Sequence, residues 1–356
     1  MTRTNYLSAA VLCIASLMAI PAQAATLNSP YNTLTGDAPL VIGHRGAPAY
    51  LPENSIGGNE LAAEMGSDFI ETDVMMTKDN VLIAMHDTTL ERTTDVAAFY
   101  APRNGGYAVS DFTYDELKLL AVKPTGTGDE TYSGFTPSGD DPYRIPTFAD
   151  MLDALTAYND ANGTSVGMLT EGKYSDNIET SRAVIRTLIE KGYDTPEKSV
   201  VQSFDFDNVS DYADLLAAAG VEMGVAQLGI GWPLDDGTLG VLSFGGAFGT
   251  LSELSSYTDT VALGFGTITE ELIAAAHGEG LSVYGWTFRP EDLEDAFDLA
   301  KPFLDWGLDG FITDNPDYLR LAIDGYGSEL APVPLPAGLP LLLVGLFGLA
   351  GLKRRT

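Results

Sequence analysis

The sequence has little cysteine and few basic residues. Cys13 is its single cysteine and lies in an N-terminal apolar run, so no disulfide framework can hold a fold together. Only 19 Lys and Arg stand against 50 Asp and Glu, which gives a formal net charge of −31. Nucleic acids bind basic protein surfaces, so this shortage excludes them as the expected partner. Hydrophobic residues make up 45% of the 356 positions, which predicts a globular protein with its own core.

Long apolar runs are also scarce, and one of them lies near the N-terminus. Residues 1–24 are typical of a secretory signal peptide: Arg3 is the positive start, residues 7–20 are apolar, and Ala22-Gln23-Ala24 is a small-residue cleavage site. The alternative is a buried N-terminal helix. A signal peptide predicts that the protein is exported, to the periplasm, the cell surface or the medium.

The other long apolar run lies near the C-terminus, where residues 326–356 read as a linker followed by a sorting segment. Residues 335–352 carry no charge and are just long enough to span a membrane, and three basic residues follow directly. The preceding Val-Pro-Leu-Pro-Ala at 333–337 resembles the VPLPA variety of bacterial PEP-CTERM-type sorting signals. That resemblance implies transient membrane anchoring by residues 338–352 and removal of the tail by a processing protease. The alternative is a permanent C-terminal anchor.

Between these ends, residues 38–325 are predicted to form one domain. Short apolar segments rich in β-forming residues recur there, with helical stretches between most of them. They cover 40–43, 69–74, 166–170, 199–204, 222–228, 260–265, 281–287 and 310–313. This alternation predicts a (β/α)8 barrel with parallel strands, and a doubly wound open sheet is the main alternative.

Two segments interrupt the alternation. Residues 81–86 follow the second strand too closely for a crossover helix, and Lys78-Asp79-Asn80 favours a turn, so we expect a β-hairpin there. Residues 91–143 are long and rich in Gly, Asp and Thr. We interpret them as an insertion, or cap, before the next helix, without regular structure of its own and able to influence substrate choice.

Polar residues follow most of the predicted strands, at the end where the active site of such a barrel forms. They are His44-Arg45-Gly46, Glu71 and Asp73, Glu171 and Lys173, Gln202 and Ser203, Trp286-Thr287, and Thr313-Asp314-Asn315. The sequence therefore predicts that these side chains converge on one face of the barrel.

Three of these residues are acids that suit a metal ion. Glu71 and Asp73 are two positions apart on a strand and point to the same side, and Glu171 ends the neighbouring strand. Such an all-oxygen set predicts a Ca²⁺ or Mg²⁺ site. No cluster of His or Cys accompanies it, which argues against zinc. The alternative for an isolated pair of acids is solvated surface charge.

Two histidines end predicted strands beside these acids. His44 and His86 can act as a general acid and a general base, because imidazole titrates near neutrality. The alternative is a structural role for both. Arg45 and Lys173 supply local positive charge that can hold a phosphoryl group. Metal, cations and histidines together predict phosphoryl-transfer chemistry. His277, the third histidine, ends a predicted helix and has no expected catalytic role.

The motifs that contain these residues resemble those of the glycerophosphodiester phosphodiesterase family. They are VIGHRGAPAYLPENS, FIETDVMMTKDNVLIAMHDTTLERTTD, DFTYDELKLL, RIPTFADML, Glu171-Gly172-Lys173, VQSFDFD and GLDGFITDNPD. The resemblance covers roughly residues 40–320, and the long insertion is similar to that of the periplasmic, calcium-using branch. It departs from the family pattern at Thr170 and Gly172, the neighbours of Glu171.

This resemblance implies a barrel of the phospholipase-C-like phosphodiesterase type that hydrolyses glycerophosphodiesters to an alcohol and sn-glycerol 3-phosphate. The residue roles that it implies fall into four groups. The metal ligands would be Glu71, Asp73 and Glu171; the acid–base pair His44 and His86; the phosphate-binding residues Arg45 and Lys173; and the neighbours of the metal site Glu53 and Asn54. Trp286 would form an apolar wall against the glycerol, or else part of the barrel core. The implied cofactor is one divalent cation, with Ca²⁺ favoured over Mg²⁺.

Two other functions remain open at this point. The same barrel could act on lipid headgroups, as a lysophospholipase D does. A function of another class is a non-catalytic, acidic, calcium-binding surface protein. The histidine pair argues against the second alternative, because a protein that only binds cations has no use for His44 and His86.

Overall fold

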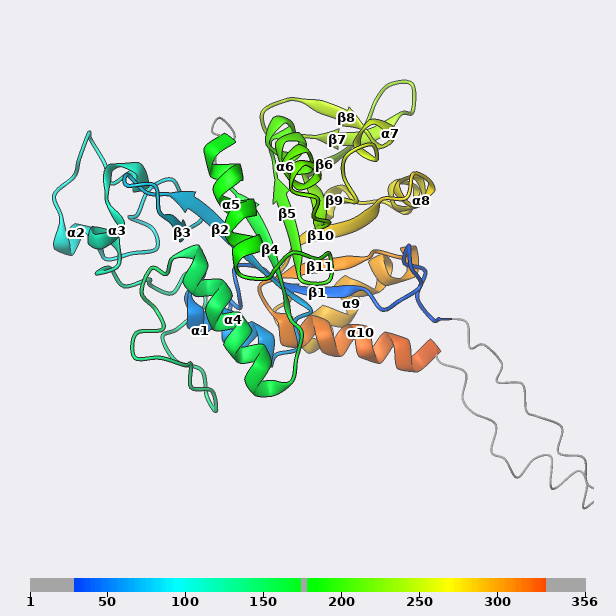
Figure 1. Ribbon diagram of the computed structural model, residues 1–356. Coiled ribbons are helices and arrows are strands. Elements are labelled where there is room, and N and C mark those ends of the chain that lie inside the picture. Colours follow the sequence, from blue (N-terminus) through cyan, green and yellow to red (C-terminus); the bar gives the residue numbers. More distant parts are fainter. Residues whose placement is uncertain (1–28, 174–177, 331–356) are drawn as a thin grey trace, which may run out of the picture. The chain divides into compact units, whose positions relative to one another are not determined.

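Eight parallel strands form a closed barrel at the centre of the computed structural model, which describes residues 29–173 and 178–330 (Figure 1). Each strand pairs with the next around the ring, and β5 pairs with β6 to close it. In ring order the strands are β1 (Leu40–Gly43), β2 (Phe69–Met76), β4 (Gly167–Gly172), β5 (Ser199–Ser203), β6 (Gly224–Pro233), β9 (Thr260–Gly264), β10 (Ser282–Phe288) and β11 (Gly310–Thr313). The predicted (β/α)8 barrel is confirmed, and the open sheet is excluded.

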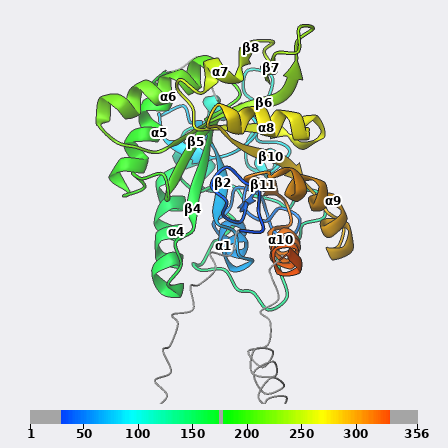
Figure 2. The same cartoon turned by 90° about the vertical axis from the view of Figure 1, so that its right-hand side faces the viewer.

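Helices surround the barrel, as Figure 2 shows from another side. They are α1 (Ile56–Glu64), α4 (Phe148–Asn162), α5 (Ile178–Glu190), α6 (Phe206–Ala219), α7 (Leu251–Leu254), α8 (Glu270–Gly278), α9 (Leu293–Trp306) and α10 (Pro316–Leu330). Local sequence sets several of their ends. Thr147 and Asp150 form a capping box at the start of α4, and Gly163 ends this helix in the left-handed conformation.

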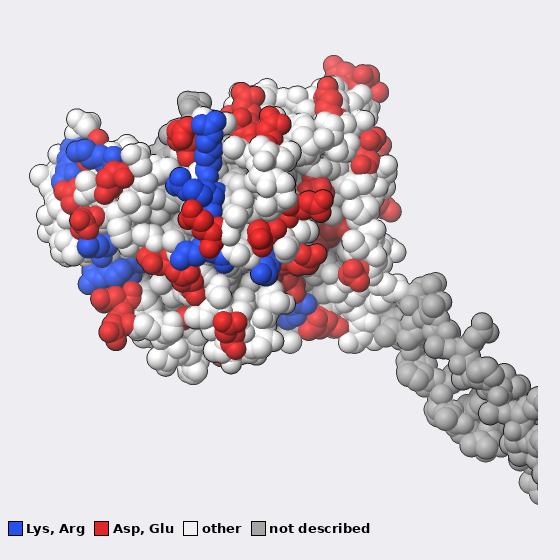
Figure 3. All heavy atoms as spheres, viewed as in Figure 1, with Lys and Arg blue, Asp and Glu red and all other residues white. Residues whose placement is uncertain are grey.

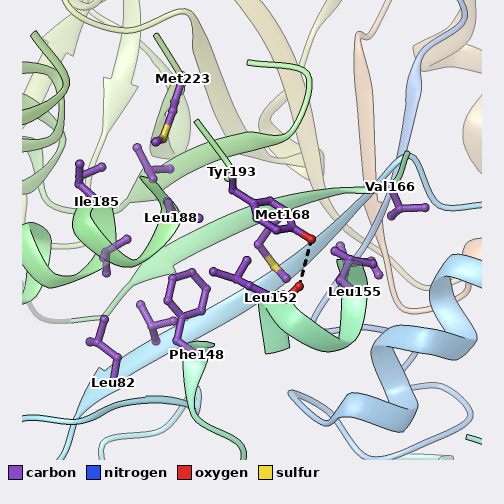
Figure 4. Packing of buried hydrophobic residues seen from close by; sticks show 14 of the residues in the cluster. Leu82, Phe148, Leu152, Leu155, Val166, Met168, Ile185, Leu188, Tyr193 and Met223 are labelled. Atoms are coloured by element: carbon purple, nitrogen blue, oxygen red, sulfur yellow. Dashed lines mark hydrogen bonds between the residues drawn. The ribbon is translucent and has the colours of Figure 1, made fainter. Parts of the chain in front are cut away.

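The apolar core lies on both sides of the strands. Inside the barrel, every strand contributes an apolar residue: Ile42, Phe69, Leu169, Val200, Ala226 and Leu228, Ala262, Tyr284 and Ile312. Outside it, the strands pack against the helices. Figure 4 shows part of this outer layer, where the Tyr193 hydroxyl donates to the carbonyl of Leu152 at 3.3 Å. These layers fix the strands whose carboxyl ends carry the polar residues.

The polar residues stand two positions beyond the apolar residues of the barrel interior. Ile42 is followed in this way by His44, Phe69 by Glu71, Leu169 by Glu171, Val200 by Gln202, Tyr284 by Trp286, and Ile312 by Asp314. Side chains two apart on a strand point to the same side, so the same faces that fill the barrel also build its polar mouth.

The predicted hairpin after the second strand is present: β3 (Leu82–Ala84) pairs antiparallel with β2. The expectation that residues 91–143 lack regular structure is wrong in part. They contain α2 (Val96–Phe99), the 3₁₀ turn η1 (Val109–Asp111) and α3 (Tyr114–Leu117). Apolar residues of this segment, including Phe112 and Leu117, form a buried cluster with Met75 and Ile83 of the hairpin. Burial of that cluster orders the first part of the insertion, up to Val122 (cyan in Figure 1).

A second addition was not predicted. β6 continues past the barrel and forms a three-stranded antiparallel extension with β7 (Leu239–Leu242) and β8 (Phe248–Thr250). The sequence there is rich in glycine and shows no clear alternation, which is why no strands were predicted in it. The helix that follows, α7, is a single turn.

The predicted signal peptide (1–24) and the predicted sorting segment, with its membrane anchor at 338–352, lie outside the described residues. Within residues 29–173 and 178–330, no helix is long and apolar enough to cross a membrane. The viewed face of the described body carries acidic side chains spread over many elements, with fewer basic ones between them (Figure 3).

Candidate active site

Three acidic side chains meet at the carboxyl ends of two neighbouring strands. Glu71 and Asp73 are on β2, and Glu171 is on β4, where it pairs in register with Asp73. All three are buried, and one carboxylate oxygen of each lies within 4.8 Å of the others. The structure thus brings together the three acids that the sequence marks as metal ligands.

Burial makes the charge of these acids costly. It raises the pKa of Glu71 well above the ordinary value, and the charges of Asp73 and Glu171 raise it further. Burial also raises the pKa of Glu171, against the opposing charge of Lys173. Burial alone would raise the pKa of Asp73 too, but Lys173 and Arg45 hold it below its ordinary value. A crowded set of carboxylate oxygens at this depth fits a hard divalent cation.

Two basic side chains lie against the acids. Lys173 Nζ is 2.8 Å from Asp73 Oδ1 and 2.6 Å from Glu171 Oε1. Arg45 Nε is 3.2 Å from Asp73 Oδ2, and the backbone N–H of Arg45 donates to Glu71 Oε2 at 2.8 Å. The acids hold both cations at the site, where they can bind the oxygens of a phosphoryl group.

A tight turn after β1 positions Arg45. Arg45 itself has a φ of 53°, and Gly46 has a φ of 95°. A Cβ on Gly46 would lie 2.7 Å from the carbonyl carbon of Gly58, so only glycine fits against α1 here. The Asn54 N–H donates to the carbonyl oxygen of Arg45 at 2.9 Å and closes the loop.

His44 is buried at the end of β1 and is held by Asp314. Its Nδ1 lies 2.6 Å from Asp314 Oδ1, and Arg289 Nε donates to the other Asp314 oxygen at 2.5 Å. Burial would raise the pKa of Asp314, but the bond to His44 and the charge of Arg289 keep it below its ordinary value. Burial lowers the pKa of His44, which favours the neutral ring. With Nδ1–H donated to Asp314, the free Nε2, 4.0 Å from Glu71 Oε2, can accept a proton.

His86 follows β3 and has a parallel arrangement. Its Nδ1 lies 2.6 Å from Asp87 Oδ1. Arg92 donates to both oxygens of Asp87, at 2.6 and 2.9 Å, and these bonds lower the pKa of Asp87 to about 2. Burial lowers the pKa of His86. Each histidine therefore has its Nδ1 on a carboxylate that also accepts a hydrogen bond from an arginine.

Glu53 and Asn54 form hydrogen bonds that hold other residues of the site in place. Glu53 accepts hydrogen bonds from Arg45 at 3.2 Å and from Arg92 at 2.8 Å on each oxygen, so it links the two arginines. The Asn54 carboxamide donates to Asp73 Oδ2 at 2.8 Å and accepts from the Asp73 N–H at 3.0 Å. These contacts fix Arg45 and Asp73 in place.

A cavity of about 530 Å³ opens over these residues. Both histidines line it, as do Arg45, Lys173, Glu71 and Glu171, whereas Asp73 lies beneath it. Three aromatic rings form an apolar part of its wall: the Phe244 ring stacks on that of Phe204 at 4.7 Å, and Trp286 meets Phe204 edge-on at 5.5 Å. Trp286 is thus part of the cavity wall, not only of the barrel core.

Several residues of this site had no role assigned in the prediction. Asp314 was expected only to lie on the same face of the barrel, and Asp87, Arg92, Arg289 and Phe244 were not singled out. Two of them carried a usable signal, because Asp87 directly follows His86, and Asp314 directly follows the last barrel strand. Phe244 carried none, because it lies in the β7–β8 connection, which the sequence did not predict.

Comparison with known proteins identifies the family. The model of the glycerophosphoryl diester phosphodiesterase family matches residues 44–318, which is most of the chain and includes every residue of the site described above. The chain belongs to the glycerophosphoryl diester phosphodiesterase family.

Other members of the glycerophosphoryl diester phosphodiesterase family cover the chain to different extents. The glycerophosphodiester phosphodiesterase of Haemophilus influenzae is 31% identical over 212 residues, which are 55% of this chain and 58% of that protein. The chain thus spans little more than half of that relative. The glycerophosphodiester phosphodiesterase of Bacillus subtilis is 26% identical, with 88% of this chain and 96% of the relative covered.

A solved structure supports the fold. An Oleispira antarctica phosphodiesterase, in complex with the product sn-glycerol-3-phosphate, superposes with a TM-score of 0.58 at 20% identity, covering 82% of this chain and 99% of that one. At this level of identity the likeness concerns the fold alone, and it agrees with the barrel described above.

Proposed function

We propose that this protein hydrolyses glycerophosphodiesters to an alcohol and sn-glycerol 3-phosphate. Membership of the glycerophosphoryl diester phosphodiesterase family and the names of its relatives support this activity. One observation carries the proposal: two imidazoles, two basic side chains and two of the three clustered acids line a single cavity that also has an apolar wall. A protein that only bound cations would need neither the two imidazoles nor the apolar wall.

The two histidines would move the protons. One imidazole Nε2 removes the proton from the attacking oxygen, and the other imidazolium protonates the oxygen of the departing alcohol. If water attacks, this step gives sn-glycerol 3-phosphate directly. If the glycerol 2-hydroxyl attacks, the step gives a cyclic glycerol phosphate, which a water then opens to sn-glycerol 3-phosphate with the roles of the two histidines reversed. Asp314 and Asp87 keep both rings oriented with Nε2 available. Arg45 and Lys173 bind the phosphoryl oxygens and compensate the charge that develops on them.

Glu71, Asp73 and Glu171 would hold one divalent cation, and we favour Ca²⁺ over Mg²⁺. When bound, the cation would supply positive charge at the phosphodiester, in addition to that of Arg45 and Lys173. The depth of the triad and its carboxylate oxygens support a hard cation of either kind.

Replacing each histidine by alanine tests the proposal. We expect kcat for release of glycerol 3-phosphate from glycerophosphocholine to fall by about 10²–10⁴-fold in His44→Ala and in His86→Ala. Circular dichroism should show that both variants are folded. EDTA should abolish the wild-type activity, and added Ca²⁺ should restore it. Near-normal turnover in either variant would refute the proposed chemistry, and cation binding without turnover in the wild type would favour the non-catalytic alternative.

A second candidate activity is that of a lysophospholipase D on the same barrel. The observation that favours it is Phe244, which is 69% exposed beside the cavity and could contact an acyl chain. Comparing glycerophosphocholine with lysophosphatidylcholine separates the two activities. If the second is correct, Phe244→Ala should raise KM for the lysolipid only.

The proposal includes export. The composition of residues 1–24 supports a cleaved signal peptide, and that of residues 326–356 supports a sorting segment that anchors the chain transiently through 338–352 until a processing protease removes it. Mass spectrometry of the protein from its native host should find new termini near Ala24 and in the sorting segment.

A further inference from the structure

Gln202 is a buried carboxamide beside the acidic triad that the mechanism above does not use. It is the next-to-last residue of β5, pairs in register with Glu171 and lines the cavity. Only 1% of its surface is exposed, and its Oε1 has no hydrogen-bond partner in the described part of the chain. A buried amide oxygen without a partner is costly. Because Gln202 also lines the cavity, its oxygen is expected to meet a group that the protein binds there.

The distance to Glu71 indicates which group that is. Gln202 Nε2 lies 3.5 Å from Glu71 Oε1, which is at the far limit of a hydrogen bond. A half-turn of the carboxamide exchanges its nitrogen and oxygen and places Oε1 at a similar separation from Glu71. Two oxygens that share one Ca²⁺ at right angles lie about 3.4 Å apart, because each binds the ion at roughly 2.4 Å. The spacing therefore suits two ligands of one cation.

We propose that Gln202 supplies a fourth, neutral oxygen ligand to the divalent cation that Glu71, Asp73 and Glu171 would hold. The inference rests on the cation site of the proposed function. A neutral ligand suits a place where three acids already repel one another, because it adds an oxygen without adding charge. It also favours Ca²⁺, which takes six to eight oxygen ligands and so gains from one more.

Two substitutions distinguish a ligand from a residue that merely donates a hydrogen bond to Glu71. Gln202→Met keeps the size of the side chain but offers only a soft sulfur. Gln202→Glu keeps an oxygen but removes the N–H donors. A ligand role predicts that Ca²⁺ affinity falls at least about 10-fold in the Met variant and is retained or increased in the Glu variant. A donor role predicts a loss in both.

Calorimetric titration of the chelator-treated full chain with Ca²⁺ measures these affinities without reference to turnover. Gln227→Met is the matched control: Gln227 is a buried carboxamide on the next strand whose Oε1 also lacks a partner in the described residues, but it donates to the backbone carbonyls of Ser203 and Leu228 and does not line the cavity. We expect this variant to be less heat-stable than the wild type, with unchanged Ca²⁺ affinity.

The outcomes separate this inference from the proposed function. Wild-type affinity in Gln202→Met, or a Gln202→Glu variant that binds Ca²⁺ more weakly than the wild type, would overturn the ligand role. If Gln202→Met does not fold, the Glu variant decides alone. Glu171→Gln should abolish binding whatever the role of Gln202. A wild-type chain that binds neither Ca²⁺ nor Mg²⁺ would overturn the cation site itself, and the proposal for Gln202 with it.

Discussion

At the scale of single residues, each histidine of the site depends on one carboxylate. Asp314 accepts the Nδ1 hydrogen of His44, and Asp87 that of His86, both at 2.6 Å. Each carboxylate fixes the ring orientation and the tautomer that leaves Nε2 free. In the proposed reaction these two acids are therefore positioning residues, because they would act through the imidazoles.

We predict that Asp314→Asn lowers kcat by about 10²–10⁴-fold, because an amide can present its NH₂ to Nδ1 and stabilise the wrong tautomer. KM and Ca²⁺ affinity should stay near the wild-type values, since Asp314 contacts neither the triad nor Lys173 in the described structure. Steady-state kinetics and calorimetry provide the measurement. An unchanged kcat would show that the tautomer of His44 does not limit the reaction.

Asp87 gives a prediction about pH. Its pKa falls from an ordinary value near 4 to about 2 on folding, so its ion pair with Arg92 stabilises the native state above roughly pH 4. That stabilisation is lost as the pH falls from 4 through 2. Between pH 6 and pH 3, the urea midpoint should therefore fall further in the wild type than in Asp87→Asn. Equal changes in both proteins would contradict the depressed pKa.

Most residues of the site could be predicted because barrel geometry converts sequence position into spatial position. Glu71, Glu171 and His44 stand at strand ends, and strand ends converge. Asp87 and Asp314 were visible in the same motifs, but their roles depend on the direction in which each imidazole points. That direction is set by packing of side chains from different strands, which the sequence does not show.

At the scale of elements, the packing of β4 against α6 explains the glycine beside Glu171. A Cβ on Gly172 would lie 2.2 Å from the hydroxyl of Tyr212, which is fully buried on α6. The glycine at this position, which departs from the pattern that the resemblance implies, is therefore paired with a large side chain behind the strand. Thr170, the other departure, is buried on the same strand, and nothing in the structure explains it.

We predict that Gly172→Ala destabilises the protein by about 1–3 kcal/mol and displaces Glu171 and Lys173, because the added methyl group collides with the tyrosine hydroxyl. Tyr212→Phe removes that hydroxyl. The double variant should therefore be more stable than Gly172→Ala alone, and it should recover part of the lost activity. Urea denaturation of the four proteins measures the coupling. Additive effects of the two substitutions would contradict the proposed collision.

The elements that the sequence predicted are those with regular alternation. The eight barrel strands and the β3 hairpin are short apolar runs bounded by turns, and each was placed within a few residues. The β7–β8 extension has glycines where a strand normally carries apolar side chains, and its partner is the overhang of β6. The ordered structure of the insertion could not be predicted for another reason. Its apolar residues are widely spaced along the sequence and come into contact only in the folded cluster.

At the scale of the whole molecule, the two ends of the barrel differ in what their residues do. The carboxyl ends of the strands carry the site, and the opposite ends carry contacts that join neighbouring elements. His277, at the end of α8, lies there: its Nε2 is 2.8 Å from Asp309 Oδ2. Asp309 also accepts from the backbone N–H groups of Leu34 and Val283, both at 2.7 Å. This cluster ties α8 to the start of β11.

We predict that His277→Ala lowers the free energy of unfolding by about 1–3 kcal/mol, because the buried Asp309 loses a hydrogen-bond partner. The kcat of the folded enzyme should not change, since this end of the barrel is remote from the cavity. Denaturation and kinetics on the same sample provide the check. A reduced kcat would show that the two ends are coupled.

The contacts of Glu53 have a consequence for engineering. Arg92 and the Thr125 hydroxyl, both in the insertion, bind Glu53, which in turn binds Arg45. A chimaera in which residues 91–143 are exchanged with those of a relative would leave Glu53 short of two donors unless the donor segment brings equivalents of both. If the insertion sets headgroup preference as we expect, an exchange should therefore move it together with its attachment to Arg45 as one unit.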